Sequence, residues 1–241
     1  MQKIKKLSII IPVFNEEKTI FQLLEKVNEI ELIGGIEKEM IIVNDASSDN
    51  SFAEINVFLQ SFKDHNIKSI THEINQGKGA GIHSGLKIAT GDWIVIQDAD
   101  LELDPNDLNK LLEPIITSGI EVVYGSRFLD KTNKPGDGFM ARQANLFLTW
   151  LSNVVFGIKI TDMETCYKMV RGDLFKGLVL KEQRFGFEPE ITAKLAKIKG
   201  VRFKEVAIQY NARMASEGKK IGWTDGVRAM YCILKYGWFS K

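Results

Sequence analysis

Two aspartates one residue apart are the residues of this chain best suited to chemistry. Asp98 and Asp100 flank Ala99 directly after the short apolar run at residues 94–96, and no basic residue lies within eight positions on either side. Because side chains alternate along a strand, the two carboxylates would point the same way, roughly 7 Å apart along the chain. Oxygen ligands so placed favour a hard divalent cation. A solvated acidic loop is the alternative interpretation.

A third acid nearby has a structural explanation. Asp104 stands directly before Pro105, which matches a helix N-cap followed by proline at the first helical position. We therefore assign no chemistry to Asp104.

The elements that must position these residues follow from hydrophobic spacing. Apolar runs with the length of buried strands occur at residues 7–13, 40–43, 67–71, 94–96 and 121–124. Between these runs, apolar residues at helical spacing predict helices. This alternation predicts an α/β fold, a Rossmann-like and mostly parallel central sheet with helices on both faces.

The second half of the chain is less regular. Its pattern predicts helices at residues 141–156 and 189–199, a strand at 166–170, and one or two strands within 201–209. We find no internal repeat and no low-complexity linker, and at 241 residues we expect a single domain, residues 1–241.

Polar residues leave four of the predicted strands at the same edge of the sheet. They are residues 12–16, Asp45, residues 76–78, and Asp98 with Asp100. Ligands of parallel sheets bind outside the carboxyl ends of the strands. The topology alone therefore predicts one shared site at this rim.

Composition argues against several classes of protein. The net charge of +1 disfavours nucleic-acid binding by bulk electrostatics. The cysteines, Cys166 and Cys232, have neither disulfide nor metal-ligand spacing, which suits a reducing cytosol. The apolar run of five residues before Pro12 is short for a signal peptide, and no uninterrupted apolar stretch reaches the length that spans a bilayer.

Two segments have alternative interpretations as membrane contacts. Residues 141–156 carry almost no charge beyond Arg142 and predict either a buried helix or an amphipathic helix lying against a membrane. Residues 223–239 place aromatic side chains beside Arg228 and Lys235, which suits a membrane interface or an end helix docked on the core. Both pairs of alternatives stay open at this stage.

Five motifs occur in an order and at spacings that resemble a known family. They read IPVFNE at residues 11–16, VNDASSD at 43–49, NQGKG at 75–79, DAD at 98–100 and GSRF at 125–128. Together they resemble the family 2 glycosyltransferases with the GT-A fold, and among these the dolichyl- and polyprenyl-phosphate sugar synthases. The resemblance covers roughly residues 7–225, and it lies in the ordered set, since a lone Asp-x-Asp is weak evidence.

The resemblance implies a metal-dependent, inverting hexosyltransferase that moves a sugar from GDP-mannose or UDP-glucose to a lipid phosphate. About residues 1–125 would form the nucleotide-sugar-binding half, and about residues 126–241 the acceptor half with a C-terminal amphipathic helix. The implied partners are a nucleoside-diphosphate sugar, a lipid-phosphate acceptor and a membrane surface, without nucleic acid. The implied location is the cytoplasm, peripheral on the inner face of the membrane.

The donor site that the resemblance implies lies at the strand exits. Pro12, Phe14 and Glu16 would line the nucleoside pocket, and Asp45 would hold the base or ribose. Lys78 would approach the nucleotide at a helix N-terminus. The further donor-binding residues are Val43, Gln76, Asp98 and Ala99. Helix-dipole stabilisation is the structural alternative for Glu16, and a loop cap is the alternative for Asp45.

The implied metal site consists of Asp98, Asp100 and Glu102 with Mg²⁺ or Mn²⁺. Such a cation would neutralise the leaving diphosphate as a Lewis acid. Synthases of this type often have glutamine at the position of Glu102, so this third ligand departs from the pattern.

The acceptor site that the resemblance implies is made of arginines. A phosphate acceptor is ionised near neutral pH and needs cations rather than a general base. Arg127, Arg142 and Arg213 match positions where such synthases place arginines near the diphosphate and the acceptor phosphate. The catalytic residues that we expect are Asp100, Arg127, Arg142 and Glu188.

Two rival functions remain. Glu188 occupies the position where many family members with hydroxyl acceptors carry a catalytic base, which would fit polysaccharide or glycolipid synthesis. The stretch at residues 162–168 departs at Cys166 and Lys168 from the Asp-x-x-Ser-Gly-x-Arg pattern of lipid-phosphate synthases. The other rival is a non-catalytic nucleotide-sugar-binding protein, against which the presence of Asp98 and Asp100 argues.

Overall fold

A seven-stranded sheet forms the centre of the computed structural model, which describes residues 4–133, 139–212 and 223–239. Its strands lie in the order β3-β2-β1-β4-β6-β5-β7. Their bounds are β1 Lys6–Val13, β2 Glu37–Asn44, β3 Ile67–Thr71, β4 Trp93–Ile96, β5 Val122–Ser126, β6 Lys168–Arg171 and β7 Phe203–Ala207. Every neighbouring pair is parallel except those of β6, which is antiparallel to both β4 and β5. The expected α/β fold with a mostly parallel sheet is confirmed.

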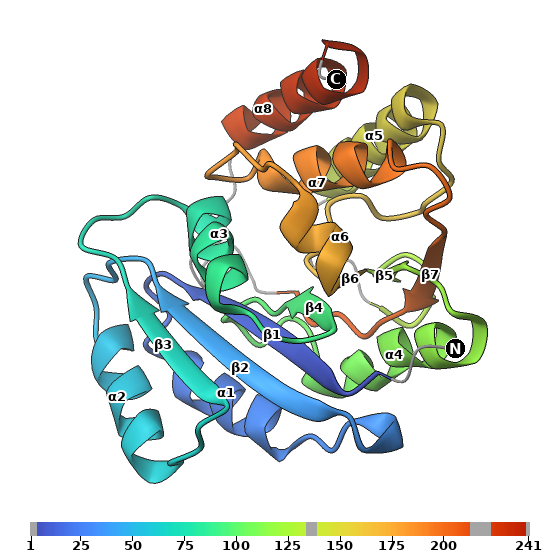
Figure 1. Cartoon of the computed structure of the whole chain (residues 1–241). Coiled ribbons are helices and arrows are strands. Elements are labelled where there is room, and N and C mark those ends of the chain that lie inside the picture. The colour runs from blue at the N-terminus through green and yellow to red at the C-terminus, as the bar shows by residue number, and fades with distance from the viewer. Residues whose placement is uncertain (1–3, 134–138, 213–222, 240–241) are drawn as a thin grey trace.

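Helices cover both faces of this sheet (Figure 1). One face carries α1 (Ile20–Glu29), α2 (Ser51–Ser61) and α4 (Leu108–Ser118), and the other carries α3 (Lys78–Ile88), α6 (Gly172–Gly177) and α7 (Phe187–Ala196). A further layer on α7 consists of α5 (Phe139–Phe156), α8 (Trp223–Leu234) and a π-helical turn at Lys235–Phe239. Short 3₁₀ turns occur at Ile33–Gly35 and Pro105–Asp107.

The central strands are apolar without alternation because both of their faces are covered. Ile9, Ile10 and Ile11 of β1 and Ile41 and Ile42 of β2 are fully buried. The strands therefore form a rigid base, and their carboxyl ends supply fixed starting points for the loops that follow.

The structure corrects several predicted boundaries. The strand predicted at residues 166–170 begins only at Lys168, because the Lys168 amide donates to the Cys166 carbonyl at 2.7 Å and so turns the backbone at Tyr167. The helix predicted at 189–199 begins earlier, at Phe187, and ends at Ala196. Asp104 does cap the turn at Pro105–Asp107, accepting a hydrogen bond from the Asn106 amide.

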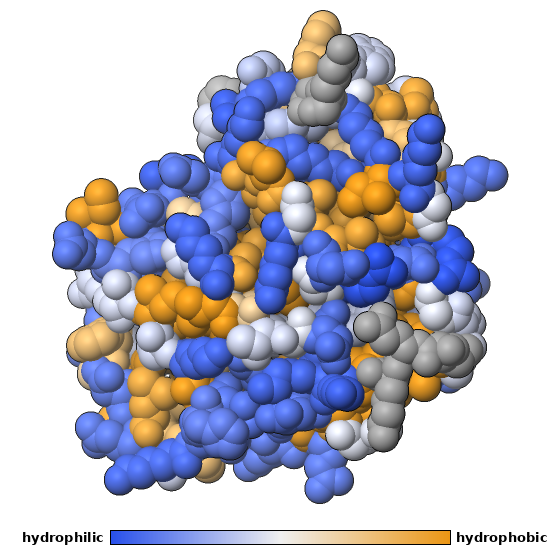
Figure 2. All heavy atoms as spheres, viewed as in Figure 1, coloured by the Kyte–Doolittle hydropathy of each residue, from blue (hydrophilic) through white to orange (hydrophobic). Residues whose placement is uncertain are grey.

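Helix α5 is not a buried helix. Its inner face holds Leu148 and Ser152 against the molecule, whereas Met140, Phe147, Trp150 and Val154 are exposed. Their spacings of seven, three and four residues place these exposed side chains on one stripe of the helix. Figure 2 shows apolar side chains on the surface in the upper part of the view, where α5 and α8 lie in Figure 1. Among the helices of the described ranges, none is long and apolar enough to cross a membrane.

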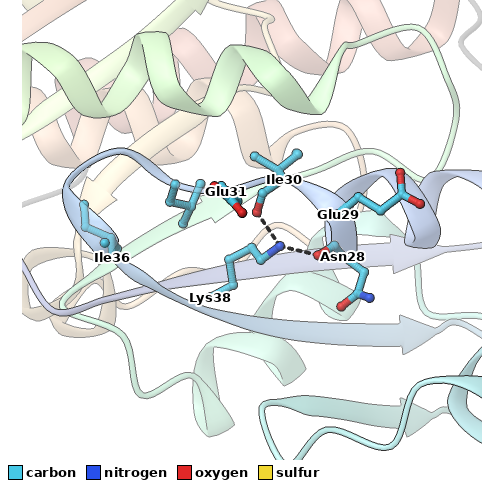
Figure 3. Close-up of a pocket in the computed structure, with 8 residues that line it drawn as sticks. Asn28, Glu29, Ile30, Glu31, Ile36 and Lys38 are labelled. Atoms are coloured by element: carbon cyan, nitrogen blue, oxygen red, sulfur yellow. Dashed lines mark hydrogen bonds between the residues drawn. The ribbon is translucent and has the colours of Figure 1, made fainter.

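A depression at the start of β2 is explained by helix termination. Figure 3 shows Lys38 pointing toward the end of α1, where its Nζ donates to the carbonyls of Asn28 and Ile30. A third bond of 3.0 Å reaches the carbonyl of Val27. Lys38 thus satisfies carbonyls that the helix end leaves unpaired, so we assign this depression a structural role.

Candidate active site

Hydrogen bonds join the strand exits into one rim. The Asn15 amide after β1 donates to Ser47 Oγ after β2 at 3.0 Å, and the Ser48 amide donates back to Asn15 Oδ1 at 2.8 Å. Asn15 and Ala46 have positive φ angles of 53° and 55°, so both loops turn sharply where their strands end. The hydroxyl of Thr19 donates to the Ala99 carbonyl at 3.1 Å. The structure therefore brings together exits that are far apart in sequence.

Asp45 organises the rim from within. Its Oδ1 accepts from the Gln76 amide at 2.9 Å and lies 2.7 Å from His72 Nδ1, while its Oδ2 accepts from the Gly77 amide at 2.7 Å. Only 2% of the residue is exposed. Both oxygens thus fix the loop that carries Gln76 into α3, and the expected contact of this carboxylate with a base or ribose stays a prediction.

Pro12 and Val43 form a floor beneath the start of α3. They are register partners on β1 and β2, and a Cβ built at Gly81 would lie 3.3 Å from Pro12 Cβ and 3.8 Å from Val43 Cγ1. Close packing here brings the N-terminus of α3 down onto the rim. Phe14 and Glu16 are half-buried in the loop above, and Glu16 Oε2 accepts from the Thr19 hydroxyl at 3.0 Å.

Lys78, the first residue of α3, reaches the first acid of the DAD motif. Its Nζ lies 2.7 Å from Asp98 Oδ1 and 3.6 Å from Glu188 Oε1. Burial alone would lower the pKa of Lys78, but the negative charges of Asp98 and Glu188 outweigh burial and raise it. Burial opposes ionisation of Asp98, yet Lys78 holds the pKa of that carboxyl below its usual range. Both groups are therefore charged at neutral pH.

The three acids assigned to a metal do not converge as one set. Asp100 Oδ1 accepts from the Glu102 amide at 3.1 Å, and Glu102 Oε2 accepts from the Tyr210 hydroxyl at 3.0 Å. Across the described ranges, no three His, Cys, Asp or Glu side chains are arranged to hold a metal ion. Asp98 and Asp100 still place two carboxylates at the same loop, whereas Glu102 is directed to Tyr210, so its metal role stays a prediction without geometric support.

Glu188 is buried and paired rather than open to a substrate. Only 4% of the residue is exposed, and its Oε2 accepts a short hydrogen bond from Lys168 Nζ. Lys168 is itself fully buried, donates to the Thr165 carbonyl, and lies 5.0 Å from the centre of the Tyr124 ring. A catalytic base needs an acceptor lone pair that faces the substrate. The ion pair with Lys168 occupies Oε2, while Oε1 lies 3.6 Å from Lys78 Nζ, so a role of Glu188 as a base stays a prediction.

Two arginines meet around one aromatic ring. The guanidinium carbons of Arg127 and Arg142 lie 5.9 and 5.8 Å from the centre of the Phe128 ring. Arg127 is fixed by buried Asp162, to which its Nε and Nη2 donate at 2.7 and 2.8 Å. Arg142 is exposed on α5. Arg213, the third predicted acceptor arginine, lies outside the described residues.

Sequence reasoning missed the residues that hold this site in place. Lys168 lies in a stretch that was singled out, but its pairing with Glu188 joins residues 20 positions apart. Asp162 and His72 orient Arg127 and Asp45 through contacts that span 35 and 27 positions. Local spacing carries no signal for such pairs. A buried lysine beside a buried acid becomes apparent only once β6 and α7 are in place.

Comparisons with known proteins identify the family of the chain. The sequence pattern described as Glycosyl transferase family 2 matches residues 8–178. An undecaprenyl-phosphate 4-deoxy-4-formamido-L-arabinose transferase from Proteus mirabilis is 27% identical over 218 residues, 90% of this chain and 64% of that protein. A dolichol-phosphate mannosyltransferase from Pyrococcus furiosus is 25% identical over 236 residues, 96% of this chain and 64% of that protein. The chain thus spans just under two thirds of the length of these relatives.

A solved structure has the same overall arrangement. Glucosyl-3-phosphoglycerate synthase from Mycobacterium tuberculosis, in complex with Mn²⁺, UDP and glucosyl-3-phosphoglycerate, matches with a TM-score of 0.70 at 15% identity. The match covers 97% of this chain and 80% of that chain. Another structure of that enzyme contains Mg²⁺ and UDP. At this identity the likeness concerns the fold alone.

Proposed function

The chain belongs to glycosyl transferase family 2 and has the GT-A fold, and we propose that it transfers a sugar, with inversion, from a nucleoside-diphosphate sugar to a polyprenyl or dolichyl phosphate. The donor would be of the GDP-mannose or UDP-glucose type. Residues 1–125 would bind this donor and residues 126–241 the acceptor. The names of the Proteus and Pyrococcus relatives, which specify undecaprenyl and dolichol phosphates, support this acceptor class.

A divalent cation, Mg²⁺ or Mn²⁺, would be held by Asp98 and Asp100. The fit rests on Asp98, which already holds a positive charge, Lys78 Nζ, at 2.7 Å and is ionised there. Bound at these oxygens, the cation would supply Lewis-acid stabilisation of the departing diphosphate. Lys78 stands at the N-terminus of α3, where backbone N–H groups and the helix dipole favour the same anion.

One observation carries the choice of acceptor: the ion pair between Glu188 and Lys168. A hydroxyl acceptor needs a base to take its proton, whereas a phosphate acceptor is already ionised. Glu188, the residue in the position of such a base, is buried, and one of its two carboxylate oxygens, Oε2, is paired with Lys168. Arg127 and Arg142, gathered at Phe128, would instead hold the acceptor phosphate. The arrangement favours the phosphate over the sugar-hydroxyl acceptor.

A lipid-linked acceptor requires access to a membrane, and the exposed stripe of α5 would provide it. Phe147 and Trp150 lie on this stripe with ring centres 5.9 Å apart, and Trp238 is exposed at the end of the adjoining π-helical turn. Arg142, also on α5, and Lys235 bring positive charge to the same elements. Aromatic side chains beside cations suit the interface of an anionic bilayer. We propose peripheral binding to the cytoplasmic face of the membrane.

A donor panel tests this function. Nucleotide sugars with different bases and sugars are added with Mn²⁺, and the melting temperature is followed. A ligand that binds only the folded state raises the melting temperature, so we expect one nucleotide sugar to stabilise the protein clearly more than the others, and only with the cation present. Equal stabilisation without Mn²⁺, or by no member of the panel, would contradict the proposal.

A further inference from the structure

Lys78 lies between two acids in a row of alternating charges, Asp98, Lys78, Glu188 and Lys168. We propose that Lys78 is a resident counter-ion that occupies Asp98 until a divalent cation binds, and that it then moves to Glu188. This inference rests on the proposed metal-dependent transfer and adds to it an exchange of one cation for another within the protein.

The contact at Asp98 supplies the first half of the exchange. At 2.7 Å, the Lys78 ammonium forms a charge-assisted hydrogen bond with the carboxylate that would coordinate the metal. An ammonium and a divalent cation on the same carboxylate repel each other strongly at such short range. The metal therefore competes with Lys78 for Asp98, and Lys78 needs another partner when it leaves.

Glu188 supplies that partner. Its Oε2 is fixed by Lys168, but within the described part of the chain its buried Oε1 has no hydrogen-bond partner. The same Oε1 lies 3.6 Å from Lys78 Nζ, an ion pair just beyond hydrogen-bond distance. A small change in the side-chain torsion angles of Lys78 would bring its Nζ within hydrogen-bond distance of Glu188 Oε1. A buried acceptor without a hydrogen bond raises the free energy of the folded state. The Lys78 ammonium would remove this cost by bonding to Oε1 of Glu188.

The exchange gives the buried acid at residue 188 a role other than that of a catalytic base. Glu188 would act as a positioning residue that receives Lys78, while the bond from Lys168 to Oε2 keeps its carboxylate oriented. The row remains charge-balanced in either position of Lys78. We therefore expect the free cation to bind weakly, since it must first displace an ammonium.

Removing the competing ammonium tests the proposal without any turnover measurement. Binding of Mn²⁺ alone is measured from the loss of the electron paramagnetic resonance signal of the free ion. For Lys78→Met we expect Mn²⁺ affinity about tenfold tighter than in the wild type, because Asp98 loses its competitor. Lys87→Met is the matched control, since it removes an exposed lysine from the last turn of the same helix. Unchanged or weaker binding by Lys78→Met would overturn the proposal.

A second substitution tests the receiving position. In the wild-type background, Glu188→Gln removes the charge that receives Lys78, and we expect Mn²⁺ to bind a few-fold more weakly. In the Lys78→Met background the same change should have no effect, because no ammonium remains to be received. An equal effect of Glu188→Gln in both backgrounds would refute the exchange, and circular dichroism would verify that each variant is folded.

Asp100→Ala separates this inference from the proposed function. Loss of Mn²⁺ binding in Asp100→Ala together with unchanged affinity in Lys78→Met would refute the exchange and leave the metal site standing. If Asp100→Ala binds Mn²⁺ as tightly as the wild type, both the metal site and the exchange that depends on it would be overturned.

Discussion

At the scale of single residues, Arg127 and Arg142, the arginines proposed to hold the acceptor phosphate, differ in how firmly they are held. Arg127 is immobilised by two hydrogen bonds to buried Asp162, whereas Arg142 is exposed and contacts only the Phe128 ring among the interactions described for it. Arg127 would thus supply a fixed guanidinium, and Arg142 an adaptable one that closes on the acceptor phosphate. The two arginines should therefore affect the enzyme differently when replaced.

Replacing Arg142 with alanine should weaken binding of the acceptor and leave binding of the donor unchanged. A hydrogen bond to a charged group contributes roughly 1.5–3 kcal/mol to binding. We therefore expect the KM for polyprenyl phosphate to rise roughly 10- to 100-fold, with the KM for the nucleotide sugar nearly unchanged. Steady-state kinetics with each substrate varied in turn measures both. Arg171→Ala is the control, because its partner is the exposed Asp173 in a surface pair. A larger effect on the donor than on the acceptor would contradict the assignment.

The positions of site residues could be predicted where the sequence signal is local, but their long-range contacts could not. The positions of Asp98, Lys78 and Arg127 at strand exits could be inferred from motifs. The engagement of Asp45 with the Gln76 and Gly77 amides could not, because it depends on how the loop after β3 folds back.

At the level of elements, Glu182 ties the C-terminal helix to the rest of the molecule. Its buried carboxylate accepts from Arg228 at 2.6 Å, from the Tyr236 hydroxyl at 2.8 Å and from Lys235 at 3.2 Å. The next residue, Gln183, accepts from the Ala80 amide of α3 at 3.1 Å. One segment thus holds α8 on one side and the start of α3 on the other.

The hydrogen bonds to the Glu182 carboxylate predict that the stability of the fold depends on pH. Burial alone would raise the pKa of Glu182, but the hydrogen bonds from Arg228, Tyr236 and Lys235 outweigh it and lower the pKa to about 2. A carboxylate whose pKa is lower in the folded than in the unfolded state stabilises the fold at pH values above its unfolded pKa. This stabilisation is lost as the pH falls from about 4.5 toward 2. Glu182→Gln should therefore cost roughly 1–3 kcal/mol at pH 7 and much less near pH 2.

Chemical denaturation at both pH values measures the difference. Asp173→Asn is the control, since Asp173 is exposed and its pair with Arg171 lies on the surface, where such pairs contribute little. A loss of stability in Glu182→Gln that is equal at pH 7 and pH 2 would show that the ionised carboxylate is not responsible.

The elements of the first half could be predicted because each strand and helix carries its own pattern. Continuous apolar runs and helical spacing are local signals, and the parallel order follows from their alternation. The antiparallel insertion of β6 between β4 and β5 could not be predicted, since pairing over such sequence distance depends on the assembled core. The burial of Lys168 on β6 could not be predicted for the same reason.

On the scale of the whole molecule, Arg142 and the apolar stripe lie on one helix, α5. Arg142 and Trp150 both lie on α5, which packs against α8. This layer stands on the face of the sheet that carries α3 and α7 (Figure 1). A membrane bound along the stripe would thus approach the acceptor half while the donor rim stays in water.

A charge placed on the stripe should detach the protein from lipid. We expect Trp150→Asp to reduce co-sedimentation with anionic liposomes by at least about fivefold, because burial of this side chain in the interface would be lost. Phe52→Asp is the control, as Phe52 is a similarly exposed aromatic on α2, across the sheet. Equal losses in the two variants, or no binding by the wild type, would contradict the membrane surface.

The most direct measurement of the central claim is the product itself. The protein is incubated with Mn²⁺, the stabilising nucleotide sugar and undecaprenyl phosphate, and the lipid fraction is analysed by mass spectrometry. We expect a glycosyl lipid phosphate from the wild type and at least about 100-fold less from Asp100→Ala, since the leaving diphosphate would lose its cation. Transfer to undecaprenol instead of its phosphate, or full activity of Asp100→Ala, would contradict the account.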